Sequence, residues 1–234
     1  MISRRDYIAS NLTDVIERIS VSARAIGSAP THIVLIAVTK TYPVTDVEIL
    51  KGLGVLNFGE NRGEEGLRKS AQVQGIWHFQ GQVQSKKLGA IASWADVIHS
   101  LDDASHINKL DQCLSRMNES EGAGKRIGVF LQLSLDGADG RGGLTENFLE
   151  PLAVSVLSTS HLDLLGIMCV PPVEMEATQA FTAIQEAHGK FTEKFPAARF
   201  LSAGMSGDFE VAITHGATHV RVGSSILGMR GLHH

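Results

Sequence analysis

Short apolar segments alternate with helical segments along almost the whole chain, and this alternation limits the fold more than any other feature of the sequence. Each unit covers roughly 20–35 residues, an apolar strand followed by a helical stretch. The pattern predicts eight strands, with C-terminal ends near Lys40, Glu60, Gly81, Leu101, Leu135, Val170, Ala203 and Ser224. Seven helical segments separate these strands, at residues 45–52, 62–73, 85–94, 103–117, 145–158, 174–194 and 208–215.

Eight consecutive strand–helix units predict an α/β fold, a closed (β/α)8 barrel of the TIM type. An open, doubly wound sheet is the alternative, because the number of strands does not by itself establish closure. An additional amphipathic helix is expected over residues 3–26, where Gly27 ends the pattern. No linker-like change in composition divides the chain. Residues 1–234 are therefore expected to form one domain, with the helix of residues 1–27 packing on the barrel.

Charge and cysteine content argue against several classes of function. The net charge of −4 and the lack of a basic stripe disfavour nucleic-acid binding. No signal-peptide core is recognisable, and no apolar stretch approaches the ~20 residues that span a bilayer, so a cytoplasmic protein is expected. Cys113 and Cys169 form no metal-binding pattern, and Gly216 separates His215 from His219, so no metal site is expected. No exposed apolar patch is recognisable, and a monomer is expected.

Lys40 stands at the end of the most apolar run in the N-terminal part of the chain, residues 32–39. The active sites of (β/α)8 barrels lie at the C-terminal ends of the strands. Partial burial there would lower the pKa of a lysine toward that of a nucleophilic amine. Lys40 is therefore a candidate for forming a Schiff base. The alternative is a lysine that reaches water along its extended side chain.

Small residues and hydroxyl groups follow the last two predicted strands, where barrels of this kind often bind phosphate. The two segments are residues 203–208 and 221–225. Gly207 allows close approach of an oxyanion, and Ser206 is placed to cap the following helix. An ordinary helix cap is the alternative. With Lys40 and Arg221 at the same barrel mouth, the segments describe a pocket for a phosphorylated aldehyde, and pyridoxal 5′-phosphate fits this description.

Two further features receive non-catalytic interpretations. His78 and His99 lie near predicted strand ends, and we expect them to be hydrogen-bonded residues of the barrel mouth, because their spacing matches no triad or metal motif. The glycine-rich run of residues 137–143, which includes Arg141, is expected to be a surface loop after the fifth strand.

Motifs in the same order along nearly the whole chain resemble those of the YggS/PROSC-like pyridoxal phosphate homeostasis proteins, relatives of the N-terminal barrel of alanine racemase. The matching segments are Ala37-Val38-Thr39-Lys40, Phe58-Gly59-Glu60-Asn61, Trp77-His78-Phe79 with Gly81, Gln84 and Lys87, His99-Ser100-Leu101-Asp102, Leu201 with Gly204-Met205-Ser206-Gly207-Asp208, and Arg221-Val222-Gly223-Ser224 with Gly228 and Arg230. The chain departs from the family pattern at Lys86, where an asparagine is common, at Gln82, and around Arg141.

The resemblance implies a role for each candidate residue. Lys40 would be the Schiff-base lysine and Arg221 would face the pyridine nitrogen of the cofactor. Asn61 would be a neighbour of the cofactor. The phosphate would be held by Ser206, Gly207, Gly223 and Ser224.

The same comparison predicts a protein that binds the cofactor without catalytic turnover, and hence no catalytic residues. An arginine opposite the ring nitrogen does not protonate it, so the electron-sink chemistry of the cofactor is weakened. A racemase needs a second acid–base group. The resemblance to alanine racemase implies that a tyrosine from an additional C-terminal domain would supply this group. The predicted barrel extends to about Arg230, so we expect no such domain in this chain. Tyr42 is near Lys40, but we expect it to pack over the loop before Pro43.

The expected role is intracellular vitamin B6 homeostasis, with pyridoxal phosphate as the ligand and apo enzymes or amino acids as further partners. A weak amino acid racemase, or another Schiff-base enzyme such as an aldolase, is the alternative. A regulatory module that only senses the cofactor is a third interpretation.

Overall fold

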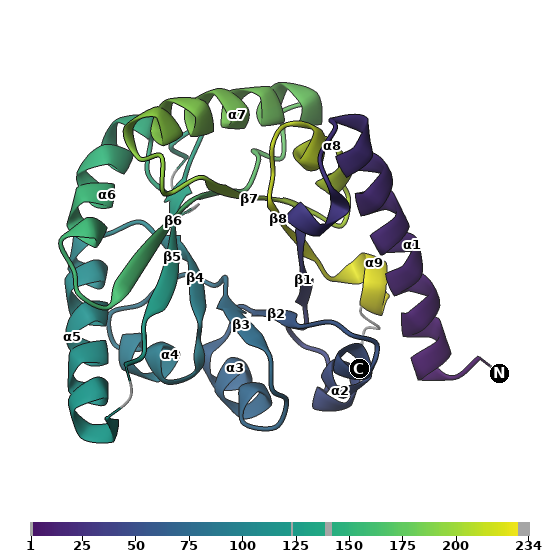
Figure 1. Ribbon diagram of the computed structural model, residues 1–234, viewed down its shortest axis with the longest axis horizontal. Coiled ribbons are helices and arrows are strands. Elements are labelled where there is room, and N and C mark those ends of the chain that lie inside the picture. Colours follow the sequence, from purple (N-terminus) through teal and green to yellow (C-terminus); the bar gives the residue numbers. More distant parts are fainter. Residues whose placement is uncertain (1, 123, 139–141, 229–234) are drawn as a thin grey trace.

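The computed structural model describes residues 2–122, 124–138 and 142–228, and in them eight parallel strands close into one barrel (Figure 1). The strands follow their order in the chain: β1 Val34–Val38, β2 Asn57–Glu60, β3 Ile76–Phe79, β4 Val97–Leu101, β5 Ile127–Leu133, β6 Leu162–Cys169, β7 Phe200–Met205 and β8 His219–Val222. Strand β1 pairs with β8 as well as with β2, which closes the sheet. The predicted (β/α)8 barrel is confirmed, and the open sheet is excluded.

Helices surround the barrel in the expected alternation. Their bounds are α1 Arg4–Ala25, α2 Val44–Gly52, α3 Gly63–Ser70, α4 Leu88–Trp94, α5 Ala104–Glu121, α6 Leu149–Leu157, α7 Ala177–Lys194, α8 Phe209–Thr214 and α9 Ser224–Leu227. Single turns of 3-10 helix cover η1 Pro30–His32 and η2 Glu146–Phe148. The segment expected as one helix at 145–158 is therefore η2 followed by α6, and the short α9 was not predicted. Within the part of the chain that the structure describes, none of the helices combines the length and the hydropathy of a transmembrane segment.

Helix α1 covers the barrel where the two helices next to it are short (Figure 1). Helices α8 and α9 have six and four residues, and the 22-residue α1 packs against both. Ile8, Leu12, Val15 and Ile19 turn inward and are buried, whereas Ile16 remains exposed. The side chain of Asn11 donates to the carbonyl of Ile226 at 3.0 Å. The predicted helix 3–26 thus fills the place that a full-length eighth helix would take.

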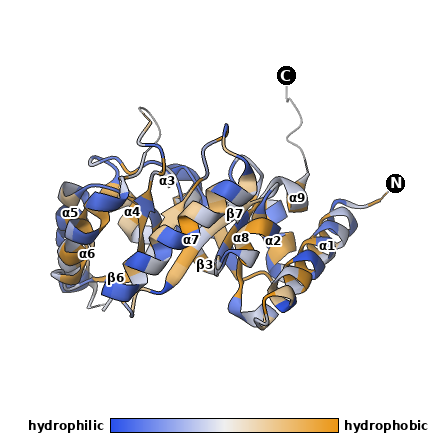
Figure 2. Cartoon of the chain, turned by 90° about the horizontal axis from the view of Figure 1, so that it is seen from above, coloured by the Kyte–Doolittle hydropathy of each residue, from blue (hydrophilic) through white to orange (hydrophobic). Residues whose placement is uncertain are grey.

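Side chains of each strand alternate between the barrel interior and the layer under the helices. Phe58 and Trp77 belong to the outer layer, and their ring centroids are 5.1 Å apart. Figure 2 shows hydrophobic strands at the centre and hydrophilic residues on the outward sides of the surrounding helices. At the end of β1, Val38 and Lys40 face the barrel mouth, while Thr39 between them faces α3. This alternation separates two networks of polar side chains. One lies inside the barrel and includes His78 and His99, and the other lies outside it and includes Glu60 and Lys69.

Candidate functional site

A cavity of about 430 Å³ opens at the C-terminal ends of the strands, where the fold predicts the active site. Residues from six of the eight strand ends line it: Val38, Lys40, Tyr42, Asn61, Gln80, Met168, Val170, Met205, Ser206, Gly207, Arg221, Gly223 and Ser224. The structure therefore brings together every site residue that the sequence suggested. It adds Gln80 as a polar neighbour and three apolar residues, Met168, Val170 and Met205. Tyr42, which the sequence placed near Lys40, also lines the cavity.

Lys40 and Asn61 enter the cavity from neighbouring strands. Lys40 is half-buried and lies two residues beyond the end of β1, and Asn61 directly follows β2. The backbone around Asn61 is tightly enclosed. A Cβ atom at Gly81 would lie 2.0 Å from the carbonyl oxygen of Asn61, so only glycine leaves room there. The loop after β3, at Gly81, therefore packs directly against the backbone of Asn61 and limits its movement.

Ser206 joins the two loops that the sequence suggested as a phosphate site. Its hydroxyl oxygen accepts hydrogen bonds from the backbone N–H groups of Gly223, at 3.2 Å, and Ser225, at 3.3 Å. The hydroxyl of Ser225 donates to the carbonyl of Ser206 at 3.2 Å. Because the Ser206 oxygen is the acceptor in both of its bonds, its own hydrogen stays available to an anion in the cavity. The two loops form one cradle.

The expectation that Ser206 caps the following helix is wrong. The N-cap residue of α8 is Asp208, whose side chain accepts from the backbone N–H of Met205 at 2.6 Å. Ser206 lies two residues before this cap, and its hydroxyl turns toward β8. The cradle also has the space that an oxyanion needs: a Cβ atom at Gly207 would meet nothing within 4 Å. At Gly223, a Cβ atom would lie 3.1 Å from the carbonyl oxygen of Val38.

Arg221 forms the floor of the cavity and is held by three hydrogen bonds. One terminal nitrogen of its guanidinium donates to both the carbonyl and the hydroxyl of Ser202, each at 2.8 Å. The other terminal nitrogen donates to the carbonyl of Cys169 at 3.1 Å. Only 5% of the residue is exposed. Burial lowers the pKa of Arg221 to about 10, so the side chain remains a cation at neutral pH.

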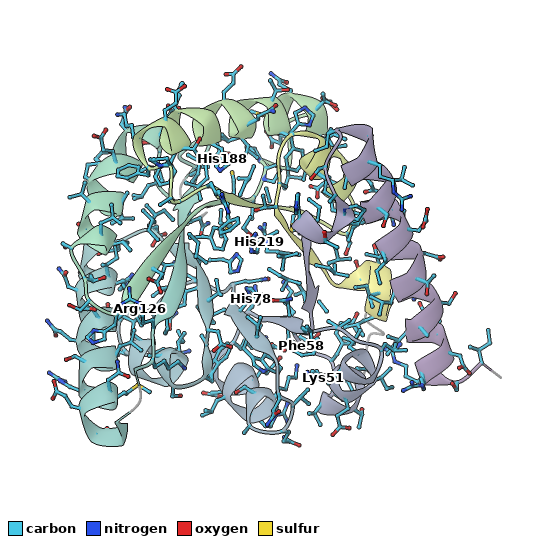
Figure 3. The ribbon with its side chains drawn as sticks, in the orientation of Figure 1. Lys51, Phe58, His78, Arg126, His188 and His219 are labelled. Atoms are coloured by element: carbon cyan, nitrogen blue, oxygen red, sulfur yellow. The ribbon has the colours of Figure 1, made fainter. Side chains whose placement is uncertain are left out.

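A chain of hydrogen bonds continues from Arg221 through the barrel interior, where Figure 3 shows His78. Ser202 Oγ lies 2.8 Å from Nδ1 of His99, and Nε2 of His99 lies 2.9 Å from Nδ1 of His78. Nε2 of His78 lies 3.0 Å from Oδ1 of Asn57. The amide oxygen Oδ1 of Asn57 only accepts, so Nε2 of His78 donates to it, and in a neutral ring Nδ1 of His78 then accepts from Nε2 of His99. Nδ1 of a neutral His99 accepts in turn from the hydroxyl of Ser202, whose oxygen accepts from Arg221. This arrangement uses the neutral form of both histidines, which their burial favours.

Sequence reasoning placed His78 and His99 at the barrel mouth, and this position is wrong. They are hydrogen-bonded, as expected, but they lie inside the barrel with 2% and 0% of their surface exposed. The inward positions of β3 and β4 carry them, because side chains alternate along each strand. Burial lowers the pKa of His78 to about 3 and holds the pKa of His99 well below its ordinary value.

These histidines predict a loss of stability in mild acid. The unfolded chain takes up protons below pH 6.5, whereas folded His78 does not until about pH 3, so stability is lost as the pH falls through this window. Each such histidine contributes a slope of about 1.4 kcal/mol per pH unit. Urea unfolding between pH 7.5 and 5 measures it. His78→Gln keeps an acceptor and a donor for the chain of hydrogen bonds. The free energy of unfolding of this variant should fall less steeply with decreasing pH than that of the parent, by the contribution of one histidine, about 1.4 kcal/mol per pH unit. Equal slopes in the two proteins would contradict the assignment.

A second polar network lies outside the barrel, next to Lys40, and sequence reasoning missed it. Lys69 of α3 and Glu60 of β2 are both fully buried, and their charged atoms are 2.7 Å apart. Burial raises the pKa of Glu60, and the hydrogen bonds from Lys69 and Thr39 partly offset this effect. A signal existed in the sequence: Glu65 and Lys69 are four residues apart in a segment with few apolar residues.

Comparisons with known proteins agree on one family. Residues 12–231 match the family described as alanine racemase, N-terminal domain. The chain is 35% identical over 245 residues to the pyridoxal phosphate homeostasis protein of Mycobacterium tuberculosis, covering 98% of this chain and 95% of that protein. It is 32% identical to the protein of the same name from Escherichia coli, over 95% of this chain and 97% of that one.

Solved structures give the same result. PipY of Synechococcus elongatus, determined with pyridoxal phosphate bound, has a TM-score of 0.79 and 26% identity, covering 94% of this chain and all of that one. Alanine racemase from Corynebacterium glutamicum shares the fold, with a TM-score of 0.70 and 15% identity. The match covers 97% of this chain but 62% of that racemase.

Proposed function

Because this chain belongs to the pyridoxal phosphate homeostasis proteins, a family built on the alanine racemase N-terminal domain, we propose that it binds pyridoxal 5′-phosphate as a reversible Schiff base on Lys40. One observation carries this proposal: a single cavity is lined by an amine, an anion cradle and a buried guanidinium. Lys40 supplies the amine, the loops of Ser206 and Gly223 supply the cradle, and Arg221 supplies the guanidinium.

The residues of the cavity fit this ligand. The cradle offers a free hydroxyl hydrogen and open space beside Gly207 for a phosphate. A buried donor also remains unused, because Nε2 of Gln80 makes no hydrogen bond among the described residues. A buried donor without a partner is costly, and an oxygen atom of a bound ligand would satisfy it. Asn61 lies on the same side of the cavity as Lys40 and would contact the ligand there.

The same residues favour storage and delivery of the cofactor over catalysis. When bound, pyridoxal phosphate supplies an aldehyde that condenses with amines, and it becomes an electron sink if its ring nitrogen is protonated. Arg221 keeps its own proton and carries a positive charge, so it opposes protonation of that nitrogen. The hydroxyl hydrogen of Tyr42 is committed to the carbonyl of Gly228 at 2.6 Å, which leaves a poor acid–base group. Holding the aldehyde on Lys40 protects intracellular amines until an apo enzyme accepts it.

Borohydride reduction followed by mass spectrometry tests the proposal. The purified protein is loaded with pyridoxal phosphate, reduced, digested and sequenced. At one equivalent of pyridoxal phosphate we expect one pyridoxyl adduct, on Lys40, whereas in a sample treated after denaturation the label should be spread over many lysines without preference for Lys40. An adduct confined to other lysines would overturn the assignment. Exchange of the α-hydrogen of alanine for deuterium at the rate of an enzyme would overturn the non-catalytic part.

A further inference from the structure

We infer that Glu60, Glu65 and Lys69 form a positioning device for Lys40, holding the residues on both sides of it in one backbone conformation. These three charged residues are called the charge cluster below. The inference deepens the proposed function, on which it rests, because it assigns residues outside the cavity to the presentation of the amine inside it.

The charge cluster first holds the residue before Lys40. The ammonium group of Lys69 donates to the carbonyl of Thr39 at 2.7 Å and to Oε1 of Glu60 at 2.7 Å. The hydroxyl of Thr39 donates to the same Glu60 oxygen at 2.6 Å. All three residues are fully buried. The side chain and the carbonyl of Thr39 are therefore both fixed, in a place that water does not reach.

The charge cluster also holds the residue after Lys40. The backbone N–H of Thr41 donates to Oε2 of Glu65 at 2.9 Å, and this oxygen lies 3.6 Å from the ammonium group of Lys69. Thr41 has a φ of +71°, in the left-handed region that β-branched residues disfavour. It is the one described residue other than glycine with a positive φ. The bond from Glu65 holds the chain in this strained turn immediately after Lys40.

Helix packing alone does not account for the charge cluster. A buried ion pair gains little over well-packed apolar side chains, because both charges must leave water. Here the second oxygen of Glu60 is buried without a hydrogen bond among the described residues, which adds to that cost. What the cluster contributes is local: among the described residues, the side-chain hydrogen bonds that it makes outside itself go to Thr39 and Thr41, and Glu65 also pairs with the exposed Arg62 at 3.5 Å.

Fixing both neighbours directs the lysine side chain. Strand alternation turns Thr39 toward α3 and Lys40 toward the cavity, and a rotation of either neighbouring peptide would move the start of the Lys40 side chain. A lysine side chain has many rotamers, so a fixed starting direction raises the share of conformations in which the amine meets the aldehyde. We therefore expect the cluster to affect how fast Lys40 reacts.

The test compares Glu65→Ala with Glu65→Gln, using Glu64→Ala, an exposed neighbour on the same helix, as the control. The rate of imine formation with pyridoxal phosphate is followed by stopped-flow absorbance, and the unfolding midpoint is measured on the same samples. Glu65→Ala should react at least tenfold more slowly while its midpoint stays within a few degrees. Glu65→Gln, which keeps an acceptor for Thr41, should recover most of the rate, and Glu64→Ala should equal the parent.

Thr41→Gly provides a second, independent variant. Glycine adopts a positive φ without strain, so the fold should be no less stable, while the turn after Lys40 becomes free to move. We expect slower imine formation without a lower unfolding midpoint. Parent rates in both Glu65→Ala and Thr41→Gly would overturn this inference and leave the Lys40 adduct intact. Absence of the adduct from the parent protein would instead overturn the proposed function.

Discussion

The Lys40→Ala protein is expected to show no visible imine absorption and no pyridoxyl adduct after borohydride reduction. Alanine cannot condense with an aldehyde, whereas the phosphate cradle and Arg221 remain in place. Some non-covalent binding should therefore survive, weaker by about a hundredfold if the covalent link contributes about 3 kcal/mol. Absorbance titration and equilibrium dialysis separate the two effects, since dialysis also detects ligand that has formed no imine.

A matched variant makes this result specific. Lys109 is exposed on α5, away from the cavity, and Lys109→Ala should keep the absorption, the adduct and the affinity of the parent. If the Lys40→Ala protein still trapped pyridoxal phosphate covalently at a single other lysine with the yield of the parent, the proposed attachment would be wrong. If its affinity were unchanged, the imine would have no part in retaining the ligand.

Among the variants proposed for this protein, Lys69→Met is expected to lower the free energy of unfolding most, by about 3–5 kcal/mol. The reason is that Glu60 would remain buried without its counter-charge. The fully buried carboxylate would also lose the hydrogen bond from Lys69. Adding Glu60→Gln should recover most of this loss, since the amide is neutral and still accepts from Thr39. Arg68→Met, at the exposed neighbouring position, should stay within about 0.5 kcal/mol of the parent. Chemical denaturation of the four proteins measures these differences.

The pH dependence of the Lys69→Met deficit gives a further check. The pKa of folded Glu60 is already raised by burial, and removal of Lys69 raises it further. A raised pKa means that the folded state holds a proton more readily than the unfolded chain. This contribution is full below the ordinary pKa of 4.5 and is lost as the pH rises through the folded value. The deficit should therefore be smaller at pH 5 than at pH 8. A deficit that does not change with pH would show that Glu60 is not the group left unpaired.

The cavity was predictable from the sequence because parallel strands bring their C-terminal ends to one face. Lys40, Ser206 and Arg221 are far apart in the chain, yet knowing that each follows or ends a barrel strand was enough to group them. Arg141 and Arg230 lie outside the described residues. The expectations for those two arginines remain predictions.

The polar networks behind the cavity were not predictable in the same way. In α3, Lys69 is fully buried while Leu67, two residues earlier, is 47% exposed, the reverse of what their hydropathy suggests. The reason is tertiary: Glu60 and Thr39 supply partners that a lone helix does not have. Similarly, His99 reads as a polar residue near a strand end, and only the closed barrel shows that Ser202, 103 positions away, meets its ring.

The way α1 sits on the molecule sets an order of events during translation. Asn11 and Ile226, which hydrogen-bond to each other, are 215 positions apart, and β1 likewise needs β8 as a neighbour. A ribosome that adds 5–20 residues per second takes about 10–40 s to make the chain between them. Throughout that time the part of the first helix that packs on α8 and α9 lacks these partners, although α2 is made early. The barrel can therefore close, and the first helix can take its final place, only after the last strand has been made.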